Sequence, residues 1–187
     1  MLKKILLALA AVIVIFLGIV AMQPADFRVV RSTTIAAPPA AIFAHINDFH
    51  RWPTWSPWAK LDPDMKQTYE GPDSGQGSVY SWAGNSKVGE GRMTLTDSRP
   101  NELVRIKLEF LKPFAAVNTT EFVLLPEGKG TAVTWSMAGK NNFISKAFCL
   151  FVNMDRMVGG DFEKGLAQMK SAVESTLERK SETTSGG

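Results

Sequence analysis

Cysteine and histidine are scarce in this 187-residue chain, which contains one cysteine and two histidines. The lone Cys149 cannot form an internal disulfide, and these few residues are not clustered at the spacing of a zinc site. The sequence also lacks a nucleophile elbow and a phosphate-binding glycine loop. We therefore expect no metal ion and no cofactor.

The excess of positive charge is also small. The formal net charge is +3, and two of the positive charges are Lys3 and Lys4 near the N-terminus. The net positive charge of the rest of the chain is too small for the basic surface with which proteins bind the phosphate backbone of nucleic acids. We expect no binding to nucleic acid.

The long apolar run of the chain is Ile5 to Met22, which contains no charged side chain. As a helix it would be about 27 Å long at ~1.5 Å per residue, enough to cross the hydrocarbon core of a membrane. Lys3 and Lys4 precede it, which favours a cytoplasmic N-terminus and a domain in the periplasm of a bacterial inner membrane. The alternative is a cleaved signal sequence and a soluble periplasmic domain, but the run is longer than the apolar core of most signal sequences and lacks a good cleavage site. We expect residues 1–25 to be a transmembrane anchor and linker.

The middle of the chain has the patterns of an antiparallel sheet. β-Branched residues predict a strand over Phe27–Ala36, a helix follows over Pro39–Ile46, and prolines predict an irregular segment over Asp48–Trp58. Glycine, proline and asparagine turns then separate six further strands, and such short connections favour antiparallel neighbours. The six are Lys66–Glu70, Gly77–Ala83, Gly89–Asp97, Leu103–Leu111, Ala116–Leu125 and Thr131–Ala138.

The end of the chain supplies a helix to cover this sheet. An apolar stripe recurs at steps of three and four residues, which is typical of an amphipathic helix. It consists of Phe162, Leu166, Met169, Val173 and Leu177. Because Phe143–Val158 also has a helical pattern, we expect one long helix with a weakness or kink at Gly159–Gly160 and a disordered tail over 181–187. The predicted fold of residues 26–180 is α+β, a curved antiparallel sheet of about seven strands wrapped around a long C-terminal helix.

Three stretches between Asp26 and Glu174 carry a resemblance to a known family. They are Arg31–Pro39 followed by Ile42–Phe43, Trp52–Trp58, and Gly130–Trp135 together with Asp161–Leu166. On these residues the chain resembles the START-like, or Bet v 1-like, superfamily, and within it the polyketide cyclase/dehydrase and lipid transport (SRPBCC) proteins. The resemblance implies a helix-grip fold with a deep apolar cavity between sheet and C-terminal helix. Some relatives are cyclases or hydrolases, and others only bind and carry hydrophobic molecules.

Aromatic and methionine side chains on the predicted inner faces are candidates for the cavity wall. Trp52, Trp55 and Trp58 would form a wall or lid of the cavity, fill the gap between the short helices and the sheet, or lie at a membrane interface. Asn118 shares the inward parity of Phe122, so its amide bonds to the backbone or orients a ligand. The complete set is Trp52, Trp55, Trp58, Tyr80, Trp82, Met93, Phe110, Asn118, Phe122, Trp135, Met137, Phe151, Met154 and Met157.

Three functions are compatible with this sequence. The first is a membrane-anchored module that binds a hydrophobic small molecule or lipid, with Gly89 and Gly91 leaving room for it. The second is a cyclase or hydrolase that uses His50, near Asp48, or Tyr80 in the same cavity. The third is an envelope interaction protein with a filled core. We expect the first, because no catalytic motif is recognisable.

Overall fold

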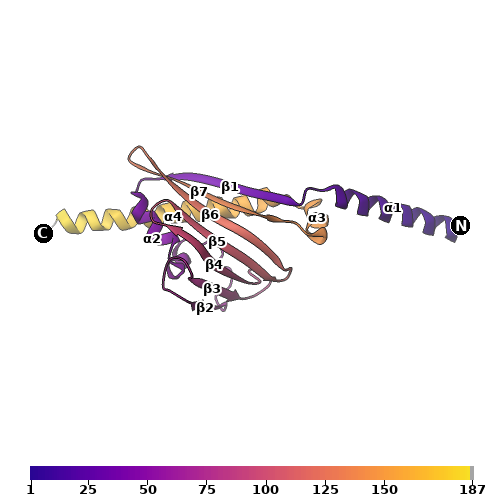
Figure 1. Ribbon diagram of the computed structural model, residues 1–187, viewed down its shortest axis with the longest axis horizontal. Coiled ribbons are helices and arrows are strands. Elements are labelled where there is room, and N and C mark those ends of the chain that lie inside the picture. Colours follow the sequence, from indigo (N-terminus) through magenta and orange to yellow (C-terminus); the bar gives the residue numbers. More distant parts are fainter. Residues whose placement is uncertain (186–187) are drawn as a thin grey trace.

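Seven strands form one antiparallel sheet in a computed structural model that describes the backbone of residues 1–185 and the side chains as far as Arg179. The strand order is β1-β7-β6-β5-β4-β3-β2 (Figure 1). The strands are β1 (Asp26–Ile35), β2 (Lys66–Glu70), β3 (Val79–Ala83), β4 (Glu90–Arg99), β5 (Leu103–Lys112), β6 (Ala116–Glu127) and β7 (Gly130–Lys140). All seven predicted strands are confirmed, with bounds that differ by two residues at most.

The chain crosses from one edge of the sheet to the other between β1 and β2. Helix α2 (Pro39–Ile46) has the predicted bounds. Pro39 fits its first turn because proline has no backbone N–H, and an N–H at that position would have no partner within the helix. The segment after it is more regular than expected, since η1 (Phe49–Thr54) is a 3-10 helix. The carboxylate of Asp48 caps η1 by accepting a hydrogen bond from the backbone N–H of His50 at 2.9 Å.

The long C-terminal helix α4 (Met154–Ser185) lies across one face of the sheet and packs against β1 (Figure 1). The predicted stripe is its buried face, and the ring of Phe162 stacks on Trp135 of β7 with 4.0 Å between centroids. The helix continues to Ser185, into the segment for which a disordered tail was expected. Gly186 and Gly187 of that tail lie outside the described residues.

The expected single helix from Phe143 onward is wrong, whereas α4 runs without interruption through Gly159 and Gly160, where a weakness or kink was expected. The helix breaks earlier, between α3 (Phe143–Cys149) and Met154, where the side chain of Asn153 accepts a hydrogen bond from the backbone N–H of Arg156. Such a cap stabilises a new helix start. Gly159 has a packing role instead, since a Cβ there would overlap the guanidinium of Arg31.

The N-terminal helix α1 (Leu2–Met22) extends away from the domain (Figure 1). Among its side chains only Val20 is buried. By length and composition α1 suffices to cross a membrane, with a mean hydropathy of 3.2, a property that it shares with signal sequences. It joins β1 through three residues, Gln23 to Ala25.

Candidate functional site

An apolar cavity of about 360 Å³ lies between the inner face of the sheet, the η1 region and the first turns of α4. This volume lies within the range of small-molecule pockets, which runs from about 300 to 1,000 Å³. Nine of the fourteen predicted residues line it. They are Trp52, Trp58, Tyr80, Trp82, Met93, Phe110, Trp135, Met137 and Met157.

Strand alternation explains why these side chains meet. Tyr80 and Trp82 lie two residues apart on β3, and their partners across the ladder are Met93 and Gly91 of β4. The register continues through β5, where Phe110 pairs with Gly91. Neighbouring strands therefore present their inward residues to one space.

Gly91 does not leave room for a ligand in the way the sequence suggested. A Cβ at this position would overlap the indole ring of Trp82, which already occupies the space above the glycine. The two rings of Tyr80 and Trp82 stack with 5.9 Å between centroids. Gly91 thus makes room for the indole ring of Trp82 in the cavity wall and not for a ligand.

Five predicted residues do not line the cavity. Trp55 and Phe122 belong to the packed core, where their rings meet edge to face at 6.0 Å, and Asn118 is buried outside the lining. Phe151 and Met154 lie outside because the helix breaks just before Met154, and the side chain of Phe151 is 79% exposed.

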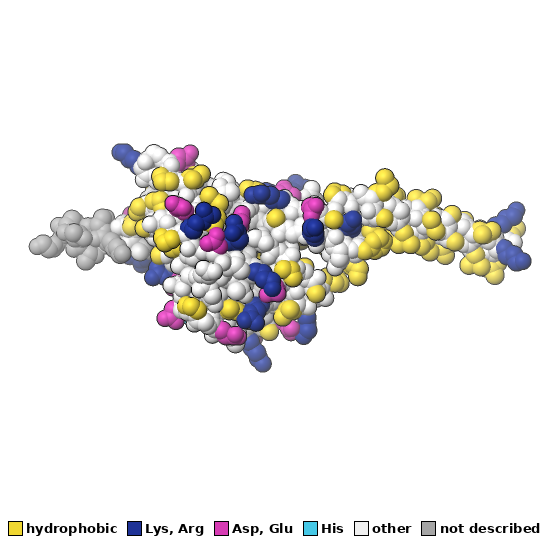
Figure 2. All heavy atoms as spheres, viewed as in Figure 1, with side chains coloured by type: hydrophobic (Ala, Val, Ile, Leu, Met, Phe, Trp, Pro, Cys, Tyr) yellow, Lys and Arg dark blue, Asp and Glu magenta, His cyan; other side chains and the backbone are white. Residues whose placement is uncertain are grey.

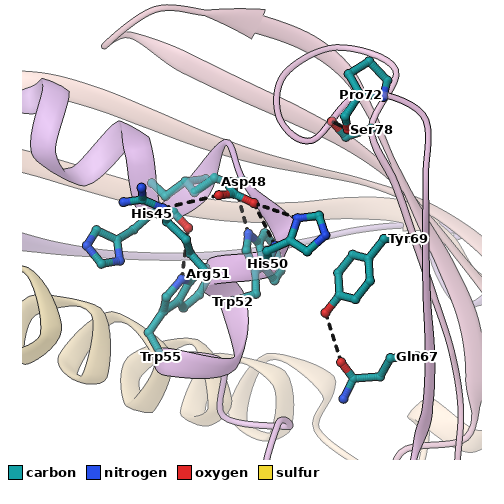
Figure 3. Close-up of polar contacts among 11 residues, drawn as sticks. His45, Asp48, His50, Arg51, Trp52, Trp55, Gln67, Tyr69, Pro72 and Ser78 are labelled. Atoms are coloured by element: carbon teal, nitrogen blue, oxygen red, sulfur yellow. Dashed lines mark hydrogen bonds and ion pairs between the residues drawn. The ribbon is translucent and has the colours of Figure 1, made fainter.

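The tryptophan cluster combines packing with a cavity role. Trp55 donates its indole N–H to the backbone carbonyl of His45 at 3.1 Å, and Trp52 donates to Ile46 at 2.9 Å (Figure 3). These bonds fix both rings between α2 and the sheet. Trp52 and Trp58 also reach the cavity wall.

Sequence reasoning missed several lining residues. Phe162 was placed on the apolar stripe of the helix but not assigned to the cavity. Leu108 shares the parity of Phe110, and Thr120 shares that of Phe122, so pattern alone could have found all three. Met65 and Lys87 lie outside the regular elements, where no periodicity marks the inward side.

Two residues of the cavity lining each carry a fully buried polar atom that has no hydrogen-bond partner within the part of the chain that the structure describes. These atoms are the hydroxyl of Thr120 and the indole N–H of Trp135, on residues that are 3% and 2% exposed. Thr120 pairs with Met137 across the β6–β7 ladder, and Trp135 lies two residues from Met137, so the two side chains are diagonal neighbours on one face. An unsatisfied buried polar group is unfavourable, and a ligand oxygen would satisfy these two atoms once neighbouring side chains shift to expose them.

The predicted Asp48–His50 pair exists, but it does not face the cavity. The Nδ1 atom of His50 lies 3.1 Å from a carboxylate oxygen of Asp48, and the imidazole stacks on the ring of Tyr69 at 4.2 Å (Figure 3). His50 lines a separate small pocket, and its side chain is 49% exposed. The other histidine, His45, is half-buried outside the cavity, and its burial and the charge of Arg51 lower its pKa.

Tyr80 is the predicted catalytic candidate that does line the cavity. Burial, and to a lesser degree Tyr69, raise the pKa of Tyr80 to about 12. Its hydroxyl therefore stays protonated at neutral pH and acts as a hydrogen-bond donor or acceptor rather than as a base.

An ion-pair cluster fixes the first turns of α4, which carry one wall of the cavity. Arg31 of β1 lies 3.0 Å from a carboxylate oxygen of Asp155 and 2.6 Å from one of Glu163. Hydrogen bonds to Asp155 and Glu163 raise the pKa of Arg31, and the same contact lowers the pKa of Asp155. Among the side chains that the structure describes, those of residues 1–179, no group of three or more histidine, cysteine or carboxylate side chains is placed to hold a metal ion.

Comparisons with known proteins agree with this fold. A family model described as polyketide cyclase/dehydrase and lipid transport matches residues 26–174. Protein CV1439 from Chromobacterium violaceum has a similar structure, with a TM-score of 0.57, 16% identity, and coverage of 81% of this chain and 99% of its own. The KanY protein gives a TM-score of 0.60 at 18% identity, with 82% and 99% coverage.

A further similar structure is the di-domain ARO/CYC protein StfQ of the steffimycin biosynthetic pathway. Its TM-score is 0.58 at 10% identity, and the match covers 82% of this chain and 52% of StfQ. No curated protein matches the sequence. At these identities the structural neighbours establish the fold.

Proposed function

Because the chain belongs to the polyketide cyclase/dehydrase and lipid transport family, we propose that it is a membrane-anchored module that binds a hydrophobic small molecule or lipid in the cavity between the sheet and α4. The observation that carries this proposal is the pair of unpartnered polar groups of Thr120 and Trp135, two residues of a largely apolar cavity wall. In a core packed only by its own side chains, two unsatisfied polar groups would be unfavourable without any compensation.

The cavity chemistry defines the class of ligand. The body of the ligand is apolar, because the cavity wall that contacts it includes Trp52, Trp82 and Phe110. The ligand also carries an oxygen atom, in a carbonyl, hydroxyl or carboxyl group. That oxygen accepts a hydrogen bond from the indole N–H of Trp135 and forms a second hydrogen bond with the hydroxyl of Thr120.

Binding without catalysis accords with the positions of the predicted catalytic candidates, His50 and Tyr80, although Asp161 and Lys87 also line the cavity. Both histidines lie outside the cavity lining, and Tyr80 inside it keeps its proton. The competing function is a cyclase-type reaction on the same ligand, in which the Tyr80 hydroxyl donates a hydrogen bond to a reacting carbonyl. Loss of turnover in Tyr80→Phe, with ligand binding retained, would favour that alternative.

Helix α1 supplies the membrane anchor in this proposal. Its length and hydropathy suit a single span, and Lys3 and Lys4 favour a cytoplasmic N-terminus. The domain then lies in the periplasm at the inner membrane of a bacterium. Such an anchor keeps the cavity beside a supply of hydrophobic molecules.

Native mass spectrometry of the full chain, released from two chemically different detergents, tests the proposal. We expect the 20.5 kDa protein with an additional mass that is the same in both detergents and is lost on denaturation. Ligand-free protein, before and after incubation with a membrane lipid extract, would contradict binding. A protein mass lacking the α1 segment would contradict anchoring.

A further inference from the structure

The strand register gathers one end of the sheet next to α1. Asp26 at the start of β1 pairs with Lys140 at the end of β7, and Phe110 near the end of β5 pairs with Ala116 at the start of β6. The β5–β6 turn, α3 and the end of α1 therefore lie at the same end of the molecule (Figure 1). We call this region the anchor-side end.

Exposed apolar side chains concentrate at the anchor-side end. Among the described residues beyond α1, eleven large hydrophobic side chains are exposed, and eight of them lie in or beside the β5–β6 turn or between α3 and the first turn of α4. They are Leu111, Phe114, Val117, Phe143, Ile144, Phe148, Phe151 and Met157. Figure 2 shows hydrophobic side chains continuing from α1 onto the adjoining part of the domain. An exposed apolar patch of this kind marks an interaction site.

Contacts between α3 and α1 set the depth of this surface. The ring of Phe151 lies 6.5 Å from the ring of Phe16, and the Nζ atom of Lys146 lies 3.5 Å from the carbonyl of Ala21. Phe16 precedes the end of α1 at Met22 by about 9 Å of helix, at ~1.5 Å per residue. If α1 spans a membrane, Phe151 therefore lies at the depth of the last turns of α1, and amphipathic segments at interfaces reach about 5–10 Å into the bilayer.

The short linker restricts the domain in the same way. Gln23 to Ala25 spans at most about 10 Å when fully extended. In addition, the backbone N–H of Asn141 donates to the carbonyl of Ala25, which ties the linker to the end of β7. The domain cannot move far from the bilayer surface.

Lysine side chains accompany the apolar patch. Lys87, Lys112, Lys140 and Lys146 come from the β3–β4 turn, the end of β5, the end of β7 and α3. Lys112 pairs with Glu90 at 2.7 Å. Lysines around an apolar surface suit a bilayer with anionic lipid headgroups, because the alkyl chains lie along apolar groups while the ammonium meets phosphate.

We infer that the anchor-side end is a membrane-docking surface, in which α3 and the β5–β6 turn insert into the interfacial layer of the leaflet where α1 ends. Lys87, Val88 and Met157 line the cavity from this end, and the β3–β4 turn adjoins the β5–β6 turn because Glu90 pairs with Lys112. A hydrophobic molecule then passes between leaflet and cavity without crossing bulk water. This inference rests on the proposed anchoring by α1 and deepens the proposed function by naming the source of the ligand.

Depth measurement with spin labels tests the docking surface. The full chain carries Cys149→Ser and one new cysteine, Phe114→Cys or Phe148→Cys, and is reconstituted into phosphatidylcholine vesicles with or without phosphatidylglycerol. The matched control is Leu125→Cys, which replaces another exposed apolar residue near the opposite end of β6. The readout is the accessibility of each label to oxygen and to a water-soluble nickel chelate.

We expect the labels at positions 114 and 148 to show several-fold lower nickel accessibility and higher oxygen accessibility than the label at position 125, with a larger difference when phosphatidylglycerol is present. Equal nickel accessibility at all three positions would overturn the inference and leave the patch as a surface for a protein partner. The measurement needs no ligand. Shielded labels in a protein that native mass spectrometry finds empty would retain docking and refute ligand binding, whereas exposed labels in a ligand-loaded protein would do the reverse.

Discussion

Replacement of Thr120 by valine separates a ligand-binding wall from an ordinary core. The Thr120 hydroxyl is buried without a hydrogen-bond partner, and valine has nearly the same shape with a methyl group in its place. An unsatisfied buried polar group costs about 1–3 kcal/mol, so we expect Thr120→Val to stabilise the empty protein by about 1 kcal/mol. For a chain of this length that is a rise of about 2–4 °C in the melting temperature.

The same substitution should weaken the complex. Loss of one ligand hydrogen bond, worth about 1 kcal/mol, lowers affinity roughly fivefold. The opposite signs in a thermal melt of ligand-stripped protein and in a binding titration are the signature of a polar group reserved for a ligand.

Thr131→Val is the matched control. Thr131 is equally buried, on β7, but its hydroxyl donates to the carbonyl of Ala37 at 2.7 Å. Its removal should destabilise the protein by about 1–3 kcal/mol and leave ligand affinity unchanged. If Thr120→Val destabilises the empty protein as much as Thr131→Val does, the hydroxyl of Thr120 is already satisfied and the reasoning fails.

Three further predictions concern other residues of the site. Gly91→Ala displaces the ring of Trp82 and should cost about 1–3 kcal/mol in urea unfolding, so unchanged stability would show that the ring does not lie there. His50→Ala should leave ligand affinity within about twofold in a titration, because an effect under 0.5 kcal/mol is usual away from the buried site; a larger loss would place His50 in the binding site. The raised pKa of Tyr80 means that stability is full below pH 10 and falls between pH 10 and about 12, where the tyrosine ionises in the unfolded chain first. Tyr80→Phe should flatten that decline in pH-dependent melts, and an identical decline in both proteins would refute the assignment.

Local patterns in the sequence were enough for the sheet and for the covering helix. Alternation along β3 and β5 and the turns between strands determine which residues pair, and the stripe from Phe162 to Val173 determines the buried face of α4. These features depend on neighbours in the sequence, with periods of about 2 and 3.6 residues.

The part of the cavity next to the start of α4 could not be predicted, because it depends on contacts that no local sequence pattern reveals. The helix break before Met154 follows from the cap at Asn153, and it removed Phe151 and Met154 from the cavity. Gly159 was expected to mark a weakness or kink, but the structure shows that it contacts the side chain of Arg31, which lies 128 positions earlier in the chain on β1. The unpartnered state of Thr120 and Trp135 depends on every neighbour of those atoms, so only the folded structure reveals it.

The most direct test of the central claim is the NMR signal of the Trp135 indole N–H. The chain has five tryptophans, and in ¹⁵N-labelled protein each indole gives its own cross-peak, which single substitutions assign. Addition of the ligand identified by mass spectrometry should shift the Trp135 signal downfield, because the free N–H gains an acceptor, while the signals of Trp52 and Trp55 move little because both already donate to backbone carbonyls. A Trp135 signal that stays in place as the ligand binds would contradict the account.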